Sequence, residues 1–314
     1  MVLLIRNLLR NNIRHLHIYG RSIPSYIPLP PYIASKTDPT PTSIIIHNEH
    51  SIQELKRAGA VVRQIFDALK GYITTGLSTQ DIDDFIFDQC LNRSVYPSPL
   101  GYRSFPKSVC TSVNEVVCHG IPEKSQILRP GDIISVDISV YNGYAHGDAC
   151  QTFVVGLDDQ LDHSDSETVG RMKTATYLCT VAKKCLDAGV SVCGPNALYT
   201  SIAEAVTKCA NAFQCRVVAG VCGHGIGSFL HGPPEIVHSI HESVSQPLVR
   251  MLPGHTFTVE PCIALSSTKF KSNTRFAIPV VLEDGWTVVT SDRVLTAQFE
   301  HTISITDKGC TILT

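Results

Sequence analysis

Residues 132–155 read Asp-Ile-Ile-Ser-Val-Asp-Ile-Ser-Val-Tyr-Asn-Gly-Tyr-Ala-His-Gly-Asp-Ala-Cys-Gln-Thr-Phe-Val-Val. The apolar alternation over 132–140 is typical of a strand, Tyr141-Asn142-Gly143 is typical of a hairpin turn, and residues 152–155 are again strand-like. Asp137 lies within the first strand, and Asp148 lies on the returning side. Because a carboxylate in a buried strand is costly unless it is paired or binds a cation, this hairpin predicts an ion pair or a metal site.

Three more ionisable residues lie in similar settings. His224 is in Gly-His-Gly-Ile-Gly, Glu260 is in Thr-Val-Glu-Pro, and Glu300 is in Phe-Glu-His-Thr. Any one of them alone is most simply an exposed charge or an ion-pair partner. Four carboxylates gathered in buried strands would repel one another unless divalent metal lay between them, and carboxylates that bridge two metals suit hydrolysis. The set predicts a paired-metal centre with the ligands Asp137, Asp148, His224, Glu260 and Glu300.

Bulk composition sets wide limits on function. The 314 residues are 43% hydrophobic and 17% charged, which is typical of a globular protein with a sizeable core. A formal net charge of -2 gives no reason to expect a nucleic-acid partner. No apolar run is long enough to predict a membrane-spanning helix. The 12 Cys form no C-x-x-C pair, so they indicate a reducing compartment in which thiols act as small apolar side chains.

The N-terminal segment differs from the rest of the chain. Its first 37 residues contain five basic side chains and no Asp or Glu, and residues 1–10 can form a basic amphipathic helix. These properties are typical of a mitochondrial transit peptide. The alternative is a plain basic tail in which the Pro-rich stretch 23–31 is a linker. The transit peptide predicts a location in the mitochondrial matrix, with the cytosol as the alternative.

The order of predicted elements repeats. Helical periodicity covers residues 51–71 and 78–90, and strand patterns follow at 109–117, 132–140 and 152–155. Helical segments are then predicted at 167–185 and 197–212, followed by strands at 217–222, 256–263, 286–290 and 300–305. Two related α+β halves around one site are therefore expected.

Several motifs carry a family resemblance. They are Pro-Leu-Gly-Tyr-Arg-Ser-Phe-Pro-Lys-Ser-Val-Cys-Thr-Ser-Val-Asn-Glu-Val-Val-Cys-His-Gly-Ile at 99–121, Cys-Gly-His-Gly-Ile-Gly at 222–227, Glu-Pro at 260–261, Asp-Gly-Trp-Thr-Val at 284–288 and Ala-Gln-Phe-Glu-His-Thr at 297–302. With them the chain closely resembles type 1 methionine aminopeptidases over residues 44–314, and its N-terminus resembles the mitochondrial form. The resemblance implies the pita-bread fold, in which two pseudo-symmetric halves enclose a dinuclear metal site. Residues 1–43 are then expected to be transit peptide and linker.

The resemblance also assigns roles to single residues. The family's ligands fall on the five residues chosen above, with Asp148 and Glu300 as the bridging carboxylates. His119 and His231 match two histidines that contact substrate, although either alone is more simply a hydrogen-bonded loop residue. With Glu260 they form the expected catalytic set. The expected lining of a methionine pocket, whose members could each be plain core residues instead, is Tyr102, Phe105, Cys110, Leu230 and Trp286.

The expected reaction is removal of the initiator methionine from peptides and nascent proteins that have a small second residue. A metal-bridging hydroxide would attack the carbonyl, Glu260 would carry a proton, and His231 would stabilise the oxyanion. The metal pair is expected to be Co, Mn, Fe or Zn. The enzyme is expected to act as a monomer. Because no ligand or pocket residue precedes Tyr102, loss of residues 1–37 is expected to leave activity intact.

Two alternatives share the pita-bread fold. One is a proline-specific aminopeptidase or prolidase, which carries a longer N-terminal domain. The other is a catalytically silent binding protein, which usually lacks some of the ligands. The chain also departs from the family in having Ala149 where Thr is usual, and in having a longer polar segment over 266–280, expected to be a surface loop.

Overall fold

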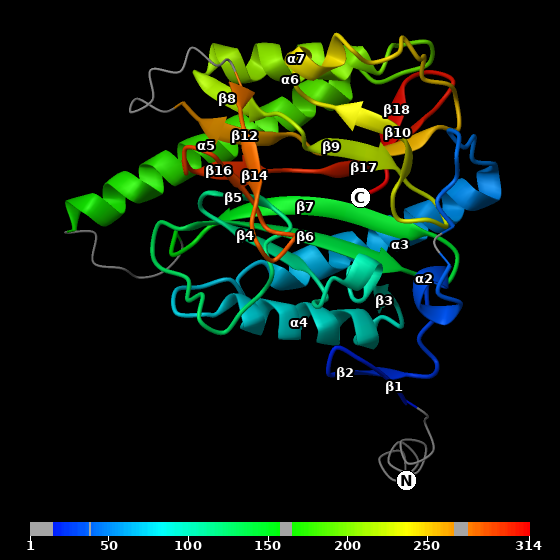
Figure 1. Ribbon diagram of the computed structural model, residues 1–314, viewed down its shortest axis with the longest axis horizontal. Helices are drawn as coiled ribbons and strands as arrows, with labels where there is room; N and C mark the ends of the chain where they lie inside the picture. Colours follow the sequence, from blue (N-terminus) through cyan, green and yellow to red (C-terminus); the bar gives the residue numbers. More distant parts are fainter. Residues whose placement is uncertain (1–14, 38, 158–164, 267–275) are drawn as a thin grey trace.

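The computed structural model describes residues 15–37, 39–157, 165–266 and 276–314 (Figure 1). One pair of long helices is α3 (Glu49–Leu69) with α4 (Thr79–Asn92), and the other is α5 (Ser166–Ser191) with α6 (Thr200–Ala212). In Figure 1 most of the strands lie between the two pairs. Because each helix pair is followed in the chain by strands, the predicted α+β class with a repeated order of elements is confirmed.

The remaining elements are short or extended. Those of the first half are β1 (His15–Ile18), β2 (Arg21–Pro24), α2 (Pro31–Ala34), β3 (Tyr96–Pro97), the 3-10 turn η1 (Tyr102–Ser104), β4 (Cys110–Val113), β5 (Val116–Cys118), β6 (Ile133–Tyr141) and β7 (His146–Val154). Those of the second half are β8 (Cys215–Val218), β9 (Cys222–Gly225), β10 (Gly232–Val237), α7 (Ile240–Ser243), β11 (Thr256–Val259), β12 (Cys262–Leu265), β13 (Phe276–Ala277), β14 (Pro279–Val281), β15 (Val288–Thr290), β16 (Thr296–Gln298), β17 (His301–Ile305) and β18 (Cys310–Ile312).

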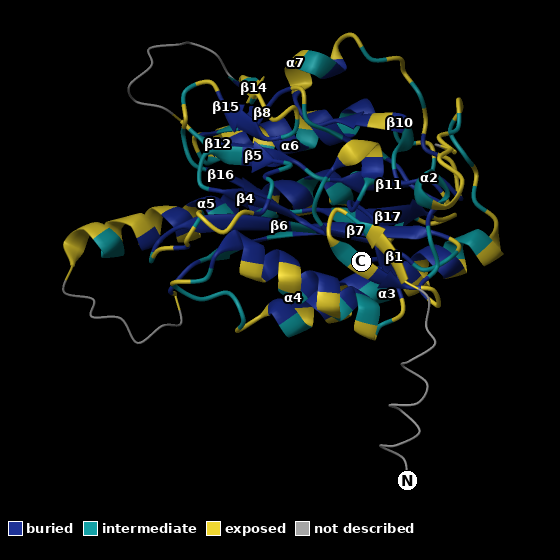
Figure 2. Cartoon of the chain, turned by 60° about the horizontal axis from the view of Figure 1, so that its bottom comes forward, coloured by how far each residue is buried: buried dark blue, intermediate teal, exposed yellow. Residues whose placement is uncertain are grey.

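Two sheets carry most of the site. In the first half β6 pairs antiparallel with β3, β4 and β7. In the second half the strand order is β10-β9-β11-β17-β18. Helix α3 packs on β6 and β7, while α5 packs on β7, β12 and β16, so apolar helix faces cover the outer sides of the strands. Figure 2 accordingly shows strands that are mostly buried and helices exposed along their outer faces.

Local sequence explains where the first two helices begin. The Asn48 side chain accepts a hydrogen bond from the Ser51 N–H at 2.9 Å, which satisfies one of the free donors in the first turn of α3. At α4 the spacing of Ser78 and Asp81 is that of a capping box, and the two residues exchange side-chain to backbone hydrogen bonds. Both helices then bury Val62, Phe66 and Ile86 in one apolar cluster.

Three predicted strands are wrong in extent, because each is broken into two. Residues 109–117 form β4 and β5, separated at Asn114, whose φ of 58° takes the chain out of strand geometry. Residues 256–263 form β11 and β12 because Pro261 has no N–H to offer a ladder. Residues 217–222 form the end of β8 and the start of β9, with Gly220 at φ 74° between them.

Two other predicted elements begin at different residues in the structure, and some strands of the structure were not predicted. The returning hairpin strand begins at His146 rather than residue 152, and the last predicted helix begins at Thr200. Residues 267–275 lie outside the described part of the chain. The expectation of a loop over 266–280 is wrong for Phe276–Ala277 and for Pro279 and Val280, because they belong to β13 and β14, which pair with β8 and β15.

The N-terminal segment is folded from His15 onward. Strands β1 and β2 form an antiparallel hairpin, and Ile23 and Ile27 are buried with Phe87 and Tyr96 in one apolar cluster. Residue 43 therefore does not separate a loose linker from a folded body. Residues 1–14 lie outside the described residues, so a transit peptide stays a prediction. Among the described helices, none is long and apolar enough to cross a lipid bilayer.

Two glycines should respond oppositely to the same substitution. A Cβ on Gly59 in α3 would collide with the backbone carbonyl of Leu313, whereas one on Gly170 in α5 would meet open space. Gly59→Ala should lower the free energy of unfolding by about 1–3 kcal/mol through overpacking. Gly170→Ala should raise it by up to about 1 kcal/mol through helix propensity. Urea denaturation of both variants measures this, and a stabilising Gly59→Ala would contradict the described packing of α3 on the C-terminus.

Candidate metal centre

The hairpin of β6 and β7 places Asp137 and Asp148 on one face. Asp137 is opposite Cys150, and Asp148 is opposite Ser139. Because directly opposed residues share a face and side chains alternate along a strand, both carboxylates lie on the same side of the hairpin. The alternation that predicted the strand thus also brings these two side chains together.

The second half contributes the other three side chains from neighbouring strands. His224 lies in β9, Glu260 directly follows β11, and Glu300 directly precedes β17. Strand β11 lies between β9 and β17 in the sheet, so these positions are adjacent. The Glu300 N–H donates to the Cys150 carbonyl at 2.9 Å, which ties the second sheet to the hairpin of the first.

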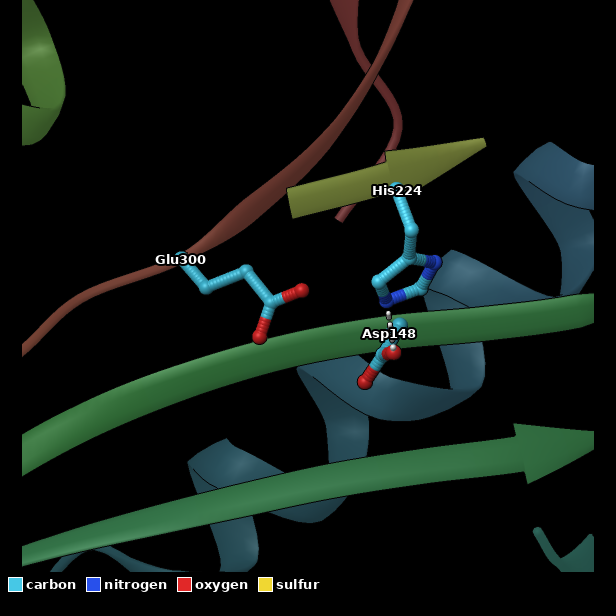
Figure 3. A group of neighbouring side chains, drawn as sticks. All are labelled: Asp148, His224 and Glu300. Atoms are coloured by element: carbon cyan, nitrogen blue, oxygen red, sulfur yellow. Dashed lines mark ion pairs between the residues drawn. The ribbon is translucent and has the colours of Figure 1, made fainter. Parts of the chain in front are cut away.

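Three of the five side chains form a close cluster. One donor atom from each of Asp148, His224 and Glu300 lies within 4.8 Å of the others, and Figure 3 shows the three side chains extending into the same space. The His224 Nε2 atom is 3.6 Å from Asp148 Oδ2 and 3.6 Å from Glu260 Oε1. Asp137 and Glu260 line the same cavity as these three. The structure therefore brings all five predicted ligands to one place.

The five predicted ligands carry more negative than positive charge, because four are carboxylates and one is an imidazole. Asp148 and Glu300 are only 4% and 3% exposed. Within the described part of the chain, Asp137 Oδ1 and Glu300 Oε1 are buried without a hydrogen-bond partner. Buried carboxylate oxygens of this kind are costly unless a cation lies against them. Oxygen donors together with one imidazole form a donor set that fits divalent Mn, Fe, Co or Zn.

The pKa values reflect the same crowding. Burial, and then the neighbouring carboxylate of Asp148, raise the pKa of Asp137 and of Glu300 well above the usual range. Burial also raises the pKa of Glu260 to about 7, against the opposing effect of the His224 charge. Burial by itself would lower the pKa of His224, but the hydrogen bond to Asp148 and the charge of Glu260 outweigh it and raise the pKa.

Several hydrogen bonds orient the carboxylates, and sequence reasoning missed their donors. Ser139 Oγ donates to Asp148 Oδ1 at 2.8 Å, and Thr258 Oγ1 donates to Glu260 Oε1 at 2.8 Å. Gln298 Nε2 donates to Glu260 Oε2 at 3.2 Å. Ser139 was detectable from the hairpin, because it is the residue opposite Asp148. Thr258 precedes Glu260 by two positions, a spacing that places both on one strand face.

Ala149 does not point toward the carboxylates. It is buried in the apolar cluster that contains Ile138 and Val62, on the opposite face of β7 from Asp148. The hydroxyl that donates a hydrogen bond to Asp148 is instead that of Ser139, which lies across the hairpin. The departure from the family at position 149 therefore lies in the packing of β7 on α3.

A cavity of about 730 Å³ opens beside the five carboxylate and imidazole groups. Every residue predicted to touch substrate lines it, namely Tyr102, Phe105, Cys110, His119, Leu230, His231 and Trp286. Trp286 packs edge-on against Phe105 at 5.1 Å between ring centroids, and His231 is 4.2 Å from the ring of His224. Thr40 and Pro279 also line the cavity and were not predicted, since they come from segments that were interpreted as linker and surface loop, and Val281 beside Pro279 lines it too.

Comparisons with known proteins agree with this geometry. Residues 53–307 match metallopeptidase family M24. The mitochondrial methionine aminopeptidase 1D of Homo sapiens is 38% identical over 294 residues, which cover 93% of this chain and 79% of the human protein. The chloroplastic/mitochondrial 1D form of Arabidopsis thaliana is 38% identical over 296 residues, covering 94% of this chain and 77% of that protein. The crystal structure of methionine aminopeptidase from Rickettsia prowazekii, 31% identical, superposes with a TM-score of 0.74 over 87% of this chain and 100% of that one.

The chain therefore belongs to metallopeptidase family M24. The expected resemblance to type 1 methionine aminopeptidases and the expected pita-bread fold are both confirmed. The prolidase from Pyrococcus furiosus also superposes, with a TM-score of 0.59 over 86% of this chain and 65% of that one. At 16% identity this likeness shows the shared fold alone.

Metal binding should depend on pH in a defined direction. Because their pKa values are raised, Asp137, Glu260 and Glu300 bind protons more readily in the metal-free chain than ordinary carboxyl groups do, and bound protons must leave when a cation binds. Added Mn(II) should therefore raise the thermal midpoint more at about pH 8 than at about pH 6. Differential scanning calorimetry with and without chelator measures both increments. An increment that is equal at both pH values, or larger at the lower one, would contradict this protonation of the carboxyl groups.

Proposed function

We propose that this chain is a metallo-aminopeptidase that removes the N-terminal methionine of peptides and nascent proteins, with preference for a small second residue. The observation that carries the proposal is the position of the buried carboxylate cluster against a cavity with aromatic and thiol walls. Thioether side chains make favourable contacts with aromatic rings, so the cavity fits a methionine side chain. The relatives at 38% identity are named methionine aminopeptidases, which supports the same activity here.

In this proposal Asp137, Asp148, His224, Glu260 and Glu300 would hold two divalent cations, with Asp148, His224 and Glu300 as the closest cluster of ligand atoms. Their opposed positions on the hairpin and on the β9-β11-β17 sheet support a site shared between the two halves of the chain. Bound there, two cations supply a water of lowered pKa and a Lewis acid for a peptide carbonyl. The identity of the metals in the cell depends on availability more than on intrinsic affinity.

The chain's own side chains carry the remaining steps. Glu260, a carboxylate that accepts hydrogen bonds from Thr258 and Gln298, takes in this proposal a proton from water and delivers it to the leaving nitrogen. Burial, and then the charge of His224, lower the pKa of His231 well below the usual range, so its imidazole is neutral. A neutral imidazole donates one N–H to the developing oxyanion without adding a charge beside the cations. His119, which lines the cavity and whose ring meets Trp286 edge-on at 5.9 Å, is assigned in this proposal to contact the scissile amide.

We further propose a mitochondrial location. Relatives from Homo sapiens and Arabidopsis thaliana are named mitochondrial or chloroplastic/mitochondrial forms. The basic, acid-free N-terminus is consistent with import. A fluorescent fusion of the full chain tests it, and a diffuse cytosolic signal would contradict the proposal.

The substrate test uses a peptide panel. The metal-loaded chain should release Met from Met-Ala-Ser and should act poorly on Met-Leu-Ser, because a large second residue fits the proposed preference badly. Ala-Pro peptides separate methionine removal from the proline-specific activity of the prolidase relatives. Faster cleavage of the Ala-Pro peptides, or no release of Met with Mn(II), Co(II), Fe(II) or Zn(II), would overturn the proposed activity.

Two variants separate metal binding from catalysis. Asp148→Asn removes the charge of a proposed ligand, so metal content and turnover should both fall sharply. His231→Ala should keep its metal while kcat falls by roughly 10²–10³, as for loss of one oxyanion donor. The exposed side chains Asp67 and His241 provide matched controls, Asp67→Asn and His241→Ala. Full metal content with normal activity in Asp148→Asn would count against the ligand assignment.

A further inference from the structure

An ionic anchor begins the folded N-terminal segment. The Arg21 guanidinium pairs with Asp83 and Asp84 in α4, and it lies over the ring of Phe87 at 4.8 Å from the centroid. Asp83 is fully buried, and its other oxygen accepts the Ser108 N–H at 2.7 Å. Arg21 therefore balances a buried charge, and removing it would leave the Asp83 carboxylate poorly compensated.

The segment then packs on the loop that forms one wall of the cavity. Ile23 and Ile27 are buried in a cluster with Leu100, one residue after the cavity-lining Pro99. At Gly101, where φ is 79°, a Cβ would lie only 2.7 Å from Ile33 Cδ1. Such close approach means that the N-terminal segment and this loop are packed against each other without spare room.

Tyr32 connects the N-terminal segment to residues beside the proposed metal site. Its hydroxyl donates to the Ser98 carbonyl at 2.6 Å, and its ring meets Tyr102 edge-on at 5.0 Å between centroids. The same ring stacks at 6.1 Å on His146, which precedes Asp148 by two residues in β7. The Ser98 hydroxyl is 2.8 Å from His146 Nδ1, so these side chains form one packed and hydrogen-bonded group.

This group reaches the proposed catalytic histidine. On its cavity side Tyr102 faces the His231 ring at 5.0 Å between centroids. Further along the chain, the Thr40 hydroxyl donates to the His231 carbonyl at 3.1 Å. The N-terminal part of the chain therefore approaches His231 in two ways. Tyr32 packs on Tyr102, which contacts the His231 ring, and Thr40 binds the His231 backbone. Tyr32 itself lies behind the cavity wall.

We infer that residues 15–35 are a permanent part of the working enzyme and that Tyr32 is a positioning residue, which holds Tyr102, and through it His231, in place for the substrate methionine. Removal of a leader from the active chain must then end before His15. The expectation that loss of residues 1–37 leaves activity intact is replaced by this inference. Its kinetic readout rests on the proposed function.

The test is made in the full chain, with three single variants loaded with Mn(II). Tyr32→Ala should lower kcat/KM for Met-Ala-Ser by about tenfold or more, with a raised KM from displacement of Tyr102, a lowered kcat from displacement of His231, and unchanged metal content. Tyr32→Phe keeps the ring and loses one hydrogen bond, so it should stay close to the wild type. Tyr26, 56% exposed on the same segment, gives the matched control Tyr26→Ala, which should match the wild type. Tyr32→Ala with wild-type kcat and KM would overturn the positioning role, even if its thermal midpoint fell.

Two truncated chains test whether residues 15–35 are an integral part of the enzyme. A chain that starts at residue 15 should keep the thermal midpoint and kinetics of the full chain. A chain that starts at residue 37 should melt at lower temperature with a weakened KM, or fail to fold, because Asp83 and the Ile23 and Ile27 sites lose their partners. An unchanged thermal midpoint and unchanged kinetics for the shorter chain would overturn the inference.

Failure of the proposed function can be distinguished from failure of the inference about residues 15–35 and Tyr32. If the full chain releases no Met with any divalent metal, the proposed activity fails, while the thermal midpoints of the two truncations still decide whether residues 15–35 are integral. In that case calorimetry with free methionine replaces the kinetic readout for Tyr32→Ala. Equal methionine affinity in Tyr32→Ala and the wild type would overturn the positioning role.

Discussion

The buried cluster of like charges between the two sheets is the constraint on which the rest of the structure depends. Asp148 and Glu300 are almost fully buried, and Asp137 and Glu260 line the same cavity. His224 lies 3.6 Å from Asp148 and from Glu260. One imidazole cannot compensate four carboxylates, and burial accordingly raises the pKa of three of them. Bound divalent cations resolve this conflict, which is why the proposed activity and the fold have a common physical origin.

The surrounding structure serves to hold these carboxylates in place. Strands end at or beside Glu260 and Glu300, so each side chain leaves the ladder and enters the cavity. Ser139, Thr258 and Gln298 donate hydrogen bonds that set the carboxylate orientations. Such supporting donors keep ligands near their working geometry before a metal arrives. The N-terminal segment adds a layer behind Tyr102, so the support of the site begins at Arg21 rather than at residue 44.

Much of the site could be predicted from sequence because its chemistry is local. The period of two in the hairpin placed Asp137 and Asp148 on one face, and the capping box of Ser78 and Asp81 located α4. What sequence could not predict depends on contacts between distant segments. The pairing of Arg21 with Asp83 joins residues 62 positions apart, and no local pattern distinguishes that arginine from those of a basic leader. The strand breaks at Asn114 and Gly220 depend on the positive φ angles of these residues. The apolar residues around them match the pattern of a continuous strand, so the breaks could not be predicted.

The most direct test of the account is the electron paramagnetic resonance spectrum of the chain loaded with two equivalents of Mn(II). Two cations bridged by shared carboxylates lie close enough for their spins to couple. A paired-metal centre predicts a spin-coupled pair signal and loss of the six-line signal of isolated Mn(II), with both effects abolished in Asp148→Asn. A spectrum of isolated, uncoupled Mn(II) at full occupancy, or a folded chain that binds no Mn(II), would contradict the paired-metal centre.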